Sequence, residues 1–213
     1  INISAQTKVN YGIQFYHGTW KEACEKAKTE NKMIFVDFYT KWCGPCLNMA
    51  ENVFVLPFIG DFYNTNFVNM KIDAENGEGV ELAKRYGVNS YPTYIFVDPS
   101  NEEVVHRSKS RQDAEQFLTT GKSALIPELR SDYLIENFAK GKNDREFLKN
   151  YINYNASIYE RENVQKAFDI LIKQGAKLTD LDVWNIFEAN IRGTNNPYFQ
   201  ELVKNYDRFL SIL

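Results

Sequence analysis

Between residues 36 and 46 the chain reads Val36-Asp37-Phe38-Tyr39-Thr40-Lys41-Trp42-Cys43-Gly44-Pro45-Cys46. The first part of this segment continues an apolar, β-rich run that begins at Met33, so we expect a buried strand that ends near Thr40. A helical pattern begins at Cys46. The two cysteines therefore lie where a buried strand passes into a helix. Asp37 is an unusual charge in the middle of such a strand.

The location of the Cys-x-x-Cys pair gives its spacing a chemical meaning. Two thiols separated by two residues at the start of a helix can close a disulfide across the first turn. The first sulfur then faces unpaired N–H groups and the positive end of the helix dipole, which favours its thiolate. A thiolate attacks a partner disulfide, and a second thiol one turn away resolves the mixed disulfide. We therefore expect Cys43 to be the nucleophile and Cys46 the resolving thiol.

Strand and helix patterns alternate on both sides of this segment. Thr19 and Glu22 have the spacing of a capping box, which predicts a helix to about Glu30. The helix that begins at Cys46 is expected to reach about Leu56, where Pro57 breaks or kinks it. The remaining predicted elements are a strand over 67–72, a helix over 79–86 closed by Gly87, a strand over 93–97, a hairpin partner over 102–107, and a helix capped by Ser110 with Asp113 that ends at Gly121.

After about residue 122 the strand patterns stop and the chain becomes helical throughout. Helices are expected over 128–140, 144–155, 161–174, 181–192 and 198–212. This helix–turn–helix rhythm is typical of an α-solenoid, although no repeat of about 34 residues can be aligned. We therefore predict an N-terminal lead-in over 1–18, an α/β domain over 19–122, and an all-α domain over 127–213. Aromatic side chains at helical spacing in this tail are interpreted as core, with a groove for a partner helix, or a dimer contact, as the alternative.

Composition excludes several classes of function. The 213 residues are 44% hydrophobic and 25% charged, which are ordinary proportions for a globular protein. The formal net charge is −3 and neither half of the chain carries an excess of basic residues, which argues against nucleic acid as a partner. No apolar run approaches the roughly 18 residues of a spanning helix, so membrane insertion is not expected.

The chain resembles the thioredoxin superfamily in two segments. The first is residues 36–46, and the second is Arg85-Tyr86-Gly87-Val88-Asn89-Ser90-Tyr91-Pro92-Thr93, which is similar to the segment that carries the cis-proline of that family. The order and spacing of the two segments agree with the family over about residues 19–121. The resemblance implies an α/β fold, with a central mixed sheet flanked by helices, followed here by an all-α domain.

The resemblance also implies roles for residues outside the cysteine pair. Asp37 corresponds to a buried carboxylate that takes the proton of Cys46, and its burial should raise its pKa. Pro92 would lie against Cys43, with the backbones of its neighbours pairing to an extended substrate segment. The implied substrate-binding residues are Trp42, Gly44, Pro45, Tyr91, Pro92 and Thr93.

Two positions compete for the role of the lysine that partners this aspartate in the family. Lys71 fits if two residues are inserted after it, whereas Asn69 occupies the same face of the same predicted strand. With Asn69, Asp37 would lack a charged partner and its pKa should lie higher still.

A zinc site is the main alternative interpretation of the cysteine pair. It would need two more ligands, and only Cys24, His17 and His106 are available, at no recognisable spacing. No metal is therefore expected. Cys24 lies beside Ala23 and Ala27 on the first predicted helix, so we interpret it as a buried and inert thiol.

The function that these residues predict is thiol–disulfide oxidoreduction on protein disulfides. The Gly44-Pro45 dipeptide is the one that reducing members of the superfamily carry, so a reductase resupplied by an upstream electron donor is expected. A disulfide isomerase or oxidase is the alternative within the enzymes. A redox-idle scaffold whose helical tail binds a partner is the alternative from another class. No cofactor is implied, because the cysteine pair itself holds the electrons.

The location of the protein is predicted from the start of the chain and from the resemblance. The chain begins with Ile1 in place of Met and its first ten residues are polar, which fits a processed, exported protein. The segment 76–79 also looks most like an insertion in exported bacterial thioredoxin-like proteins. We therefore expect a periplasmic or otherwise exported location, with a cytoplasmic one as the alternative.

Overall fold

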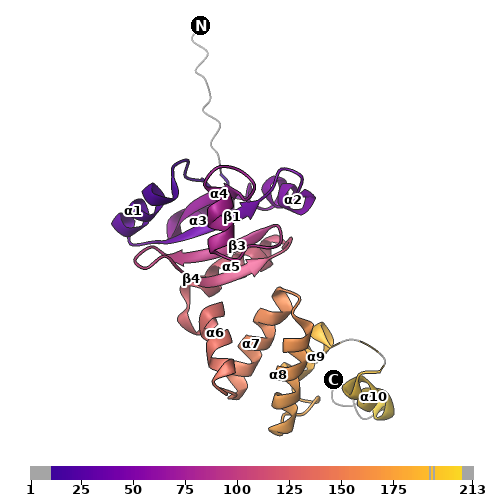
Figure 1. The fold of residues 1–213 in the computed structure, drawn as a ribbon. Helices are drawn as coiled ribbons and strands as arrows, with labels where there is room; N and C mark the ends of the chain where they lie inside the picture. Colours follow the sequence, from indigo (N-terminus) through magenta and orange to yellow (C-terminus); the bar gives the residue numbers. More distant parts are fainter. Residues whose placement is uncertain (1–10, 192, 194, 208–213) are drawn as a thin grey trace. The chain divides into compact units, whose positions relative to one another are not determined.

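The computed structural model describes residues 11–191, 193 and 195–207 (Figure 1). Contacts within the chain divide it into two compact units, the first ending at Asp132 and the second beginning at Tyr133. The first unit contains the sheet and the second is helical. None of the helices in the described part of the chain is long and apolar enough to cross a membrane.

The first unit is built on a four-stranded mixed sheet. Its strands are β1 (Met33–Tyr39), β2 (Phe67–Asp73), β3 (Thr93–Asp98) and β4 (Glu103–Lys109), in the order β2-β1-β3-β4. β1 pairs parallel to β2 and antiparallel to β3, and β4 completes the hairpin with β3. The mixed sheet flanked by helices that the sequence predicts is confirmed.

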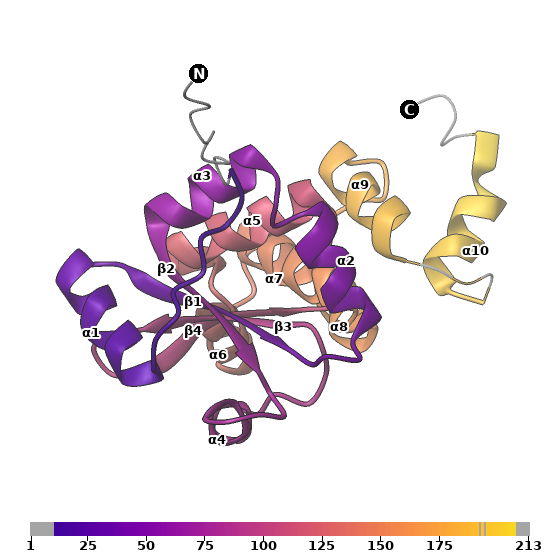
Figure 2. The same cartoon turned by 90° about the horizontal axis from the view of Figure 1, so that it is seen from above.

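Helices cover both faces of the sheet (Figure 2). One face packs against α1 (Trp20–Glu30) and α4 (Gly79–Arg85), and the other against α2 (Gly44–Asn52), α3 (Pro57–Asn66) and α5 (Ala114–Leu125). Side chains of a strand alternate between the faces, so Val36 and Phe38 enter the first core while Phe35 enters the second. Asp37 therefore points into the second layer, beneath α2.

The helix α3 is absent from the sequence prediction, which assigned to Pro57 only the role of a helix breaker. In the structure Pro57 occupies the first turn of α3, where its fixed φ suits the helix and its missing N–H is not needed. Ile59 and Tyr63, four residues apart, are buried on the face of α3 that meets the sheet. This spacing is the signal that the sequence prediction missed.

Gly121 does not end α5, as predicted, but lies within it. A Cβ atom there would approach the Phe62 and Tyr63 rings to 2.7 and 2.9 Å, so glycine is required for close packing against α3. The helix continues to Leu125. Its N-cap is Asp113 alone, whose carboxylate accepts a hydrogen bond from the Gln116 N–H.

The N-terminal lead-in belongs to the first unit. Phe15 forms a parallel bridge with Asn69, and the Tyr16 N–H donates to the Asn69 carbonyl at 2.7 Å. Gly60 lets this segment cross α3, since a Cβ there would lie 2.2 Å from the Tyr11 carbonyl oxygen. The described part of the lead-in predicted over 1–18 therefore pairs with the outer edge of β2. Residues 1–10 lie outside the described residues.

The boundary between the units lies later than the predicted 123–127. Residues Pro127–Leu129 form a 3₁₀ turn, and Ser131 is tied to β4 by two hydrogen bonds. Its hydroxyl accepts from the Arg107 N–H at 2.9 Å, and its own N–H donates to His106 Nδ1 at 3.0 Å. These bonds hold the segment to the sheet, and the loss of strand patterns after residue 122 did not indicate them.

The buried His106 side chain should make the stability of the protein depend on pH. Burial, and then the Arg130 charge, lower the pKa of this 3% exposed imidazole to about 3, below its ordinary 6.5. Between these values the unfolded chain binds the proton and the folded chain does not, so the free energy of unfolding should fall as the pH falls. We expect a loss of about 2–3 kcal/mol between pH 6.5 and 4.5 that His106→Gln removes, as measured by urea unfolding.

The matched control is His17→Gln, because His17 is exposed. That variant should keep the pH dependence of the parent protein. Equal losses in the parent protein and in His106→Gln would contradict the prediction. Other titrating groups, including Asp37, are present in all three proteins and cancel in the comparison.

The second unit is a helical array. Its helices are α6 (Ser131–Ala139), whose first turn contains the boundary, α7 (Arg145–Ser157), α8 (Arg161–Lys173), α9 (Leu181–Asn190) and α10 (Pro197–Lys204). α7 and α8 pack along each other, and their buried side chains include Ile152 and Phe168. The predicted helices are therefore present with shifted ends: α7 runs two residues past the predicted 155, whereas α6, α8 and α9 are shorter than predicted. The end of the last predicted helix, 208–212, lies outside the described residues.

Candidate active site

Cys43 and Cys46 form a disulfide at the start of α2. Their Cα atoms are 5.3 Å apart, and the two residues are 5% and 2% exposed. The helix begins at Gly44, two residues before the predicted start at Cys46. Cys43 is its N-cap, and Cys43 Sγ accepts a hydrogen bond from the Cys46 N–H at 3.1 Å. Gly44 and Pro45 are exposed in the first turn. Cys43 Sγ thus sits at the positive end of the helix dipole.

The strand β1 places Asp37 beneath this helix. The carboxyl group is 1% exposed, and neither oxygen has a hydrogen-bond partner among the described residues. Burial raises the pKa of Asp37 to about 7, and the nearby Lys71 charge opposes part of this rise. The buried group can therefore change its protonation state near neutral pH.

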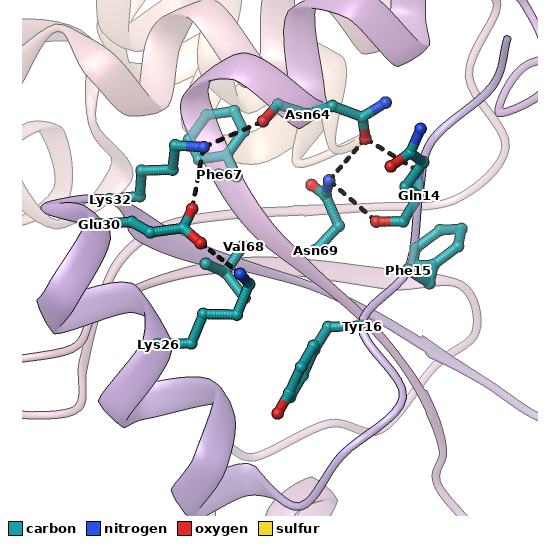
Figure 3. Close-up of a pocket in the computed structure, with 10 residues that line it drawn as sticks. All are labelled: Gln14, Phe15, Tyr16, Lys26, Glu30, Lys32, Asn64, Phe67, Val68 and Asn69. Carbon is teal, nitrogen blue, oxygen red and sulfur yellow. Dashed lines mark hydrogen bonds and ion pairs between the residues drawn. The ribbon is translucent and has the colours of Figure 1, made fainter.

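The structure selects Lys71 over Asn69 as the group that acts on Asp37. Lys71 lies opposite Asp37 in the β1–β2 register, and its Nζ is 4.8 Å from the centre of the Tyr39 ring. Asn69 turns away to the edge of the sheet, where its Nδ2 donates to Asn64 Oδ1 at 3.1 Å (Figure 3). The sequence placed both residues on one face, and only the register distinguishes them.

Figure 3 also shows what surrounds Asn69 at the edge of the sheet. A cavity of about 280 Å³ lies between the lead-in, the end of α1 and the start of β2. Its charged lining is an ion-pair network in which Glu30 contacts both Lys26 and Lys32. None of the residues proposed for catalysis lines this cavity.

The loop before β3 meets the cysteine loop. The Tyr91–Pro92 peptide bond is cis. The Tyr91 ring lies edge-on to the Trp42 ring with centroids 5.9 Å apart. The Trp42 side chain is 70% exposed, and its indole N–H donates to both carboxylate oxygens of Glu75, at 3.0 and 3.1 Å. The structure therefore brings both segments of the predicted site to one surface.

Thr93 differs from its neighbours in this loop. It pairs with Phe38 on one side and Lys109 on the other, so its backbone lies within the sheet. Its hydroxyl donates to the Ser90 carbonyl at 2.7 Å. These contacts occupy the Thr93 backbone and hydroxyl within the protein.

The residues considered as metal ligands do not come together. Cys24 is a free thiol buried in the core beneath α1, and burial raises its pKa. His106 Nδ1 is occupied by the Ser131 N–H, and His17 is exposed on the lead-in. Within the described ranges, no group of three or more His, Cys, Asp or Glu side chains is placed to hold a metal ion.

Known proteins share the segment that carries this site. Residues 15–99 match a family model described as thioredoxin-like. Thioredoxin-1 of Drosophila yakuba is 43% identical over 68 residues, which are 32% of this chain and 59% of that protein. Thioredoxin H4 of Arabidopsis thaliana is 32% identical over 107 residues, which are 48% of this chain and 83% of that protein.

A solved structure resembles the first unit in the same way. It is the solution structure of a proposed disulphide-isomerase from Bacteroides thetaiotaomicron, with 43% identity and a TM-score of 0.50. The match covers 54% of this chain and 94% of that one. Proteins of this kind use the cysteine pair itself as their redox group. The matched sequence, the mixed sheet and the Cys43–Cys46 disulfide at the start of α2 show that the chain belongs to the thioredoxin superfamily of disulfide oxidoreductases.

Proposed function

We propose that the protein is a thiol–disulfide oxidoreductase that reduces disulfides in other proteins. The observation that carries this proposal is the Cys43–Cys46 disulfide, with Cys43 Sγ at the N-terminus of α2 and a buried Asp37 beneath the helix. Protein thiols and disulfides are the substrates, and an upstream electron donor returns the pair to the dithiol.

In the reduced protein, Cys43 is the nucleophile. The helix dipole and the Cys46 N–H stabilise the thiolate of Cys43 over its thiol. The thiolate attacks one sulfur of a substrate disulfide, which forms a mixed disulfide and releases the other substrate sulfur as a thiolate. That thiolate takes a proton from water.

Cys46 resolves the mixed disulfide with the help of Asp37. The Cys46 S–H bond breaks and its proton passes to the Asp37 carboxylate. Cys46 Sγ then attacks Cys43 Sγ, the bond between Cys43 and the substrate breaks, and the substrate leaves as a second thiolate. Two electrons have passed from the pair to the substrate disulfide. A base whose pKa is about 7 is well matched to this transfer at neutral pH.

The substrate binds on the surface that Trp42 and Tyr91 share. We assign contact with substrate to Trp42, Gly44, Pro45, Tyr91 and Pro92; the Trp42 and Tyr91 rings already lie against each other. An extended segment pairs with the backbone of Tyr91, in the manner of strand addition. A cavity of about 210 Å³ beside both sulfurs, lined in part by Trp42 and Leu47, adds apolar surface.

The direction of electron flow is tested by the reduction potential of the pair. We expect a strongly reducing potential, close to that of thioredoxin at about −270 mV. It is measured by thiol alkylation in redox buffers, in the Cys24→Ala variant so that only the pair reacts. A value near about −180 or −120 mV would instead assign disulfide isomerisation or oxidation. A pair that never cycles reversibly would remove the enzyme proposal and leave the scaffold.

The exported location and a partner for the helical unit remain predictions from the sequence. The exported location bears on the reductase proposal through the electron donor. In an oxidising compartment the pair is kept reduced only by a dedicated donor, because the local redox poise drives it towards the disulfide. The helical unit is the part of the chain outside the match to thioredoxins, and we propose that it contacts a protein partner.

A further inference from the structure

Several buried polar atoms around the cysteine pair lack a hydrogen-bond partner. Within the described residues these are both Asp37 oxygens, the Thr40 hydroxyl and the Tyr94 hydroxyl, besides one amide oxygen of Asn69 at the edge of the sheet. A buried polar group without a partner is destabilising, and such groups in a folded protein commonly have a functional reason. The Thr40 and Tyr94 hydroxyls have no role in the mechanism, and Tyr94 is the one whose residue pairs with Asp37 across the sheet.

Tyr94 and Asp37 are direct neighbours across the sheet. They lie opposite each other in the antiparallel β1–β3 register, so their side chains leave the same face with Cβ atoms about 5 Å apart. Tyr94 is 0% exposed and Asp37 is 1% exposed. Each is thus a buried polar group without a hydrogen-bond partner, and the two lie opposite each other on adjacent strands.

The surroundings prevent the Tyr94 hydroxyl from reaching water at the surface. The Tyr94 ring packs against Phe35, Phe54 and Phe117, with centroids 6.1, 6.4 and 5.2 Å away. Tyr63 in the same core is different, because its hydroxyl donates to the Phe117 carbonyl at 2.8 Å. Two buried tyrosines therefore share one core, and only one of them has a backbone partner.

The Asp37 charge acts on Tyr94 in the structure. After burial, that charge is the largest cause that raises the pKa of Tyr94. The charged and titratable groups around the carboxyl are Lys71 on β2, Tyr39 on β1 and Tyr94 on β3, with the cysteine pair on α2 above. Lys71 is the cation of this set, and Tyr94 is the group on the opposite side.

We propose that Tyr94 is a positioning residue that acts on the protonation of Asp37, its hydroxyl donating to the charged carboxylate through one internal water. The hydroxyl offsets part of the cost of burying that charge, as a hydrogen bond to a carboxylate does. Asp37 is then ionised, and free to take the Cys46 proton, at a lower pH than burial alone allows. The consequence for catalysis rests on the proposed function, but the effect on Asp37 does not.

The test is the titration of Asp37 in Tyr94→Phe, a change that removes one oxygen and keeps the ring. Carbon-13 labelled aspartate in the oxidised protein reports the carboxyl group by NMR. We expect the titration midpoint of Asp37 to rise by about one pH unit in Tyr94→Phe. Tyr63→Phe is the matched control and should leave the midpoint where it is, because the Tyr63 hydroxyl is satisfied elsewhere.

An unchanged midpoint in Tyr94→Phe would overturn the proposal. In that case the hydroxyl is simply an unsatisfied group, and Tyr94→Phe should also be more stable than the parent protein above pH 8. Neither result depends on whether the protein reduces any substrate.

A second readout links the titration to catalysis. We follow the rate at which substrate is released from the mixed disulfide in single turnovers from pH 5 to 9. The pH midpoint of this rate should rise in Tyr94→Phe by the same amount as the NMR midpoint of Asp37. The steady-state KM should not change. A parent protein that reduces no disulfide would remove the proposed function, whereas the NMR titration would still decide the role of Tyr94.

Discussion

Cys43→Ser is expected to abolish disulfide reduction, and Cys46→Ala to stop it after a single attack. A hydroxyl at residue 43 cannot replace the thiolate at the start of α2, so the rate of insulin reduction by dithiothreitol should fall to that without protein. With Cys46→Ala, Cys43 still attacks but no thiol one turn away can resolve the adduct. About one substrate molecule per protein should then be trapped as a mixed disulfide, visible on a non-reducing gel.

Cys24→Ala is the control for this pair of variants. Cys24 is 4% exposed in the core beneath α1, so it should neither attack substrate nor affect the rate. An adduct that forms on Cys46 in the absence of Cys43 would reverse the two roles. Absence of any adduct in Cys46→Ala would argue for the redox-idle scaffold.

Asp37→Asn is expected to stabilise the oxidised protein at neutral pH, by about 4 kcal/mol at pH 8. Burial raises the pKa of Asp37 from 3.8 to about 7. Between these values the folded chain binds the proton and the unfolded chain does not, so the free energy of unfolding decreases as the pH rises. An asparagine has no charge to bury, and its advantage over the parent protein should grow from near zero at pH 4 to its full size above pH 7.

Urea unfolding at several pH values measures this difference. Asp61→Asn, which changes an exposed carboxylate on α3, should show no such growth with pH. A constant difference between Asp37→Asn and the parent protein from pH 4 to 8 would mean that folding does not raise the pKa of Asp37. The stabilised variant should resolve mixed disulfides more slowly, because it has lost the group that takes the Cys46 proton.

This opposition between stability and chemistry explains why an unpaired carboxylate lies in the core. An asparagine at residue 37 carries no charge to bury, yet it cannot accept a proton near neutral pH. The Lys71 charge offsets only part of the free energy needed to bury the Asp37 charge, because Lys71 Nζ lies over the Tyr39 ring and makes no hydrogen bond to Asp37. The site therefore retains a base at the expense of stability.

The local features of the site could be predicted because they depend on neighbours in the sequence. The strand Met33–Tyr39 has the predicted bounds, and Thr19 and Glu22 form the predicted capping box. The Cys43–Cys46 disulfide closes within one helical turn. Short-range periodicity, a cap and a two-residue spacing each act over fewer than about ten residues, which is the range that pattern analysis covers.

Features that depend on distant segments were missed or left open. The sequence predicted that Pro57 only breaks a helix, whereas packing of Ile59 and Tyr63 on the sheet makes Pro57 the start of α3. Gly121 was expected to end a helix and instead makes room for the Tyr63 ring. In both cases the residue type is compatible with two local structures, and packing against another element decides which of them forms.

The sequence alone determined the redox pair, the strand that leads to it and the superfamily, because these are carried by contiguous residues. Tertiary structure alone decided which residues surround Asp37. The parallel register of β1 with β2 places Lys71, and not Asn69, opposite the carboxyl, and the antiparallel register with β3 brings Tyr94 to its other side. Register is a property of paired strands: a shift of one residue exchanges the two faces of a strand, and no single segment encodes it.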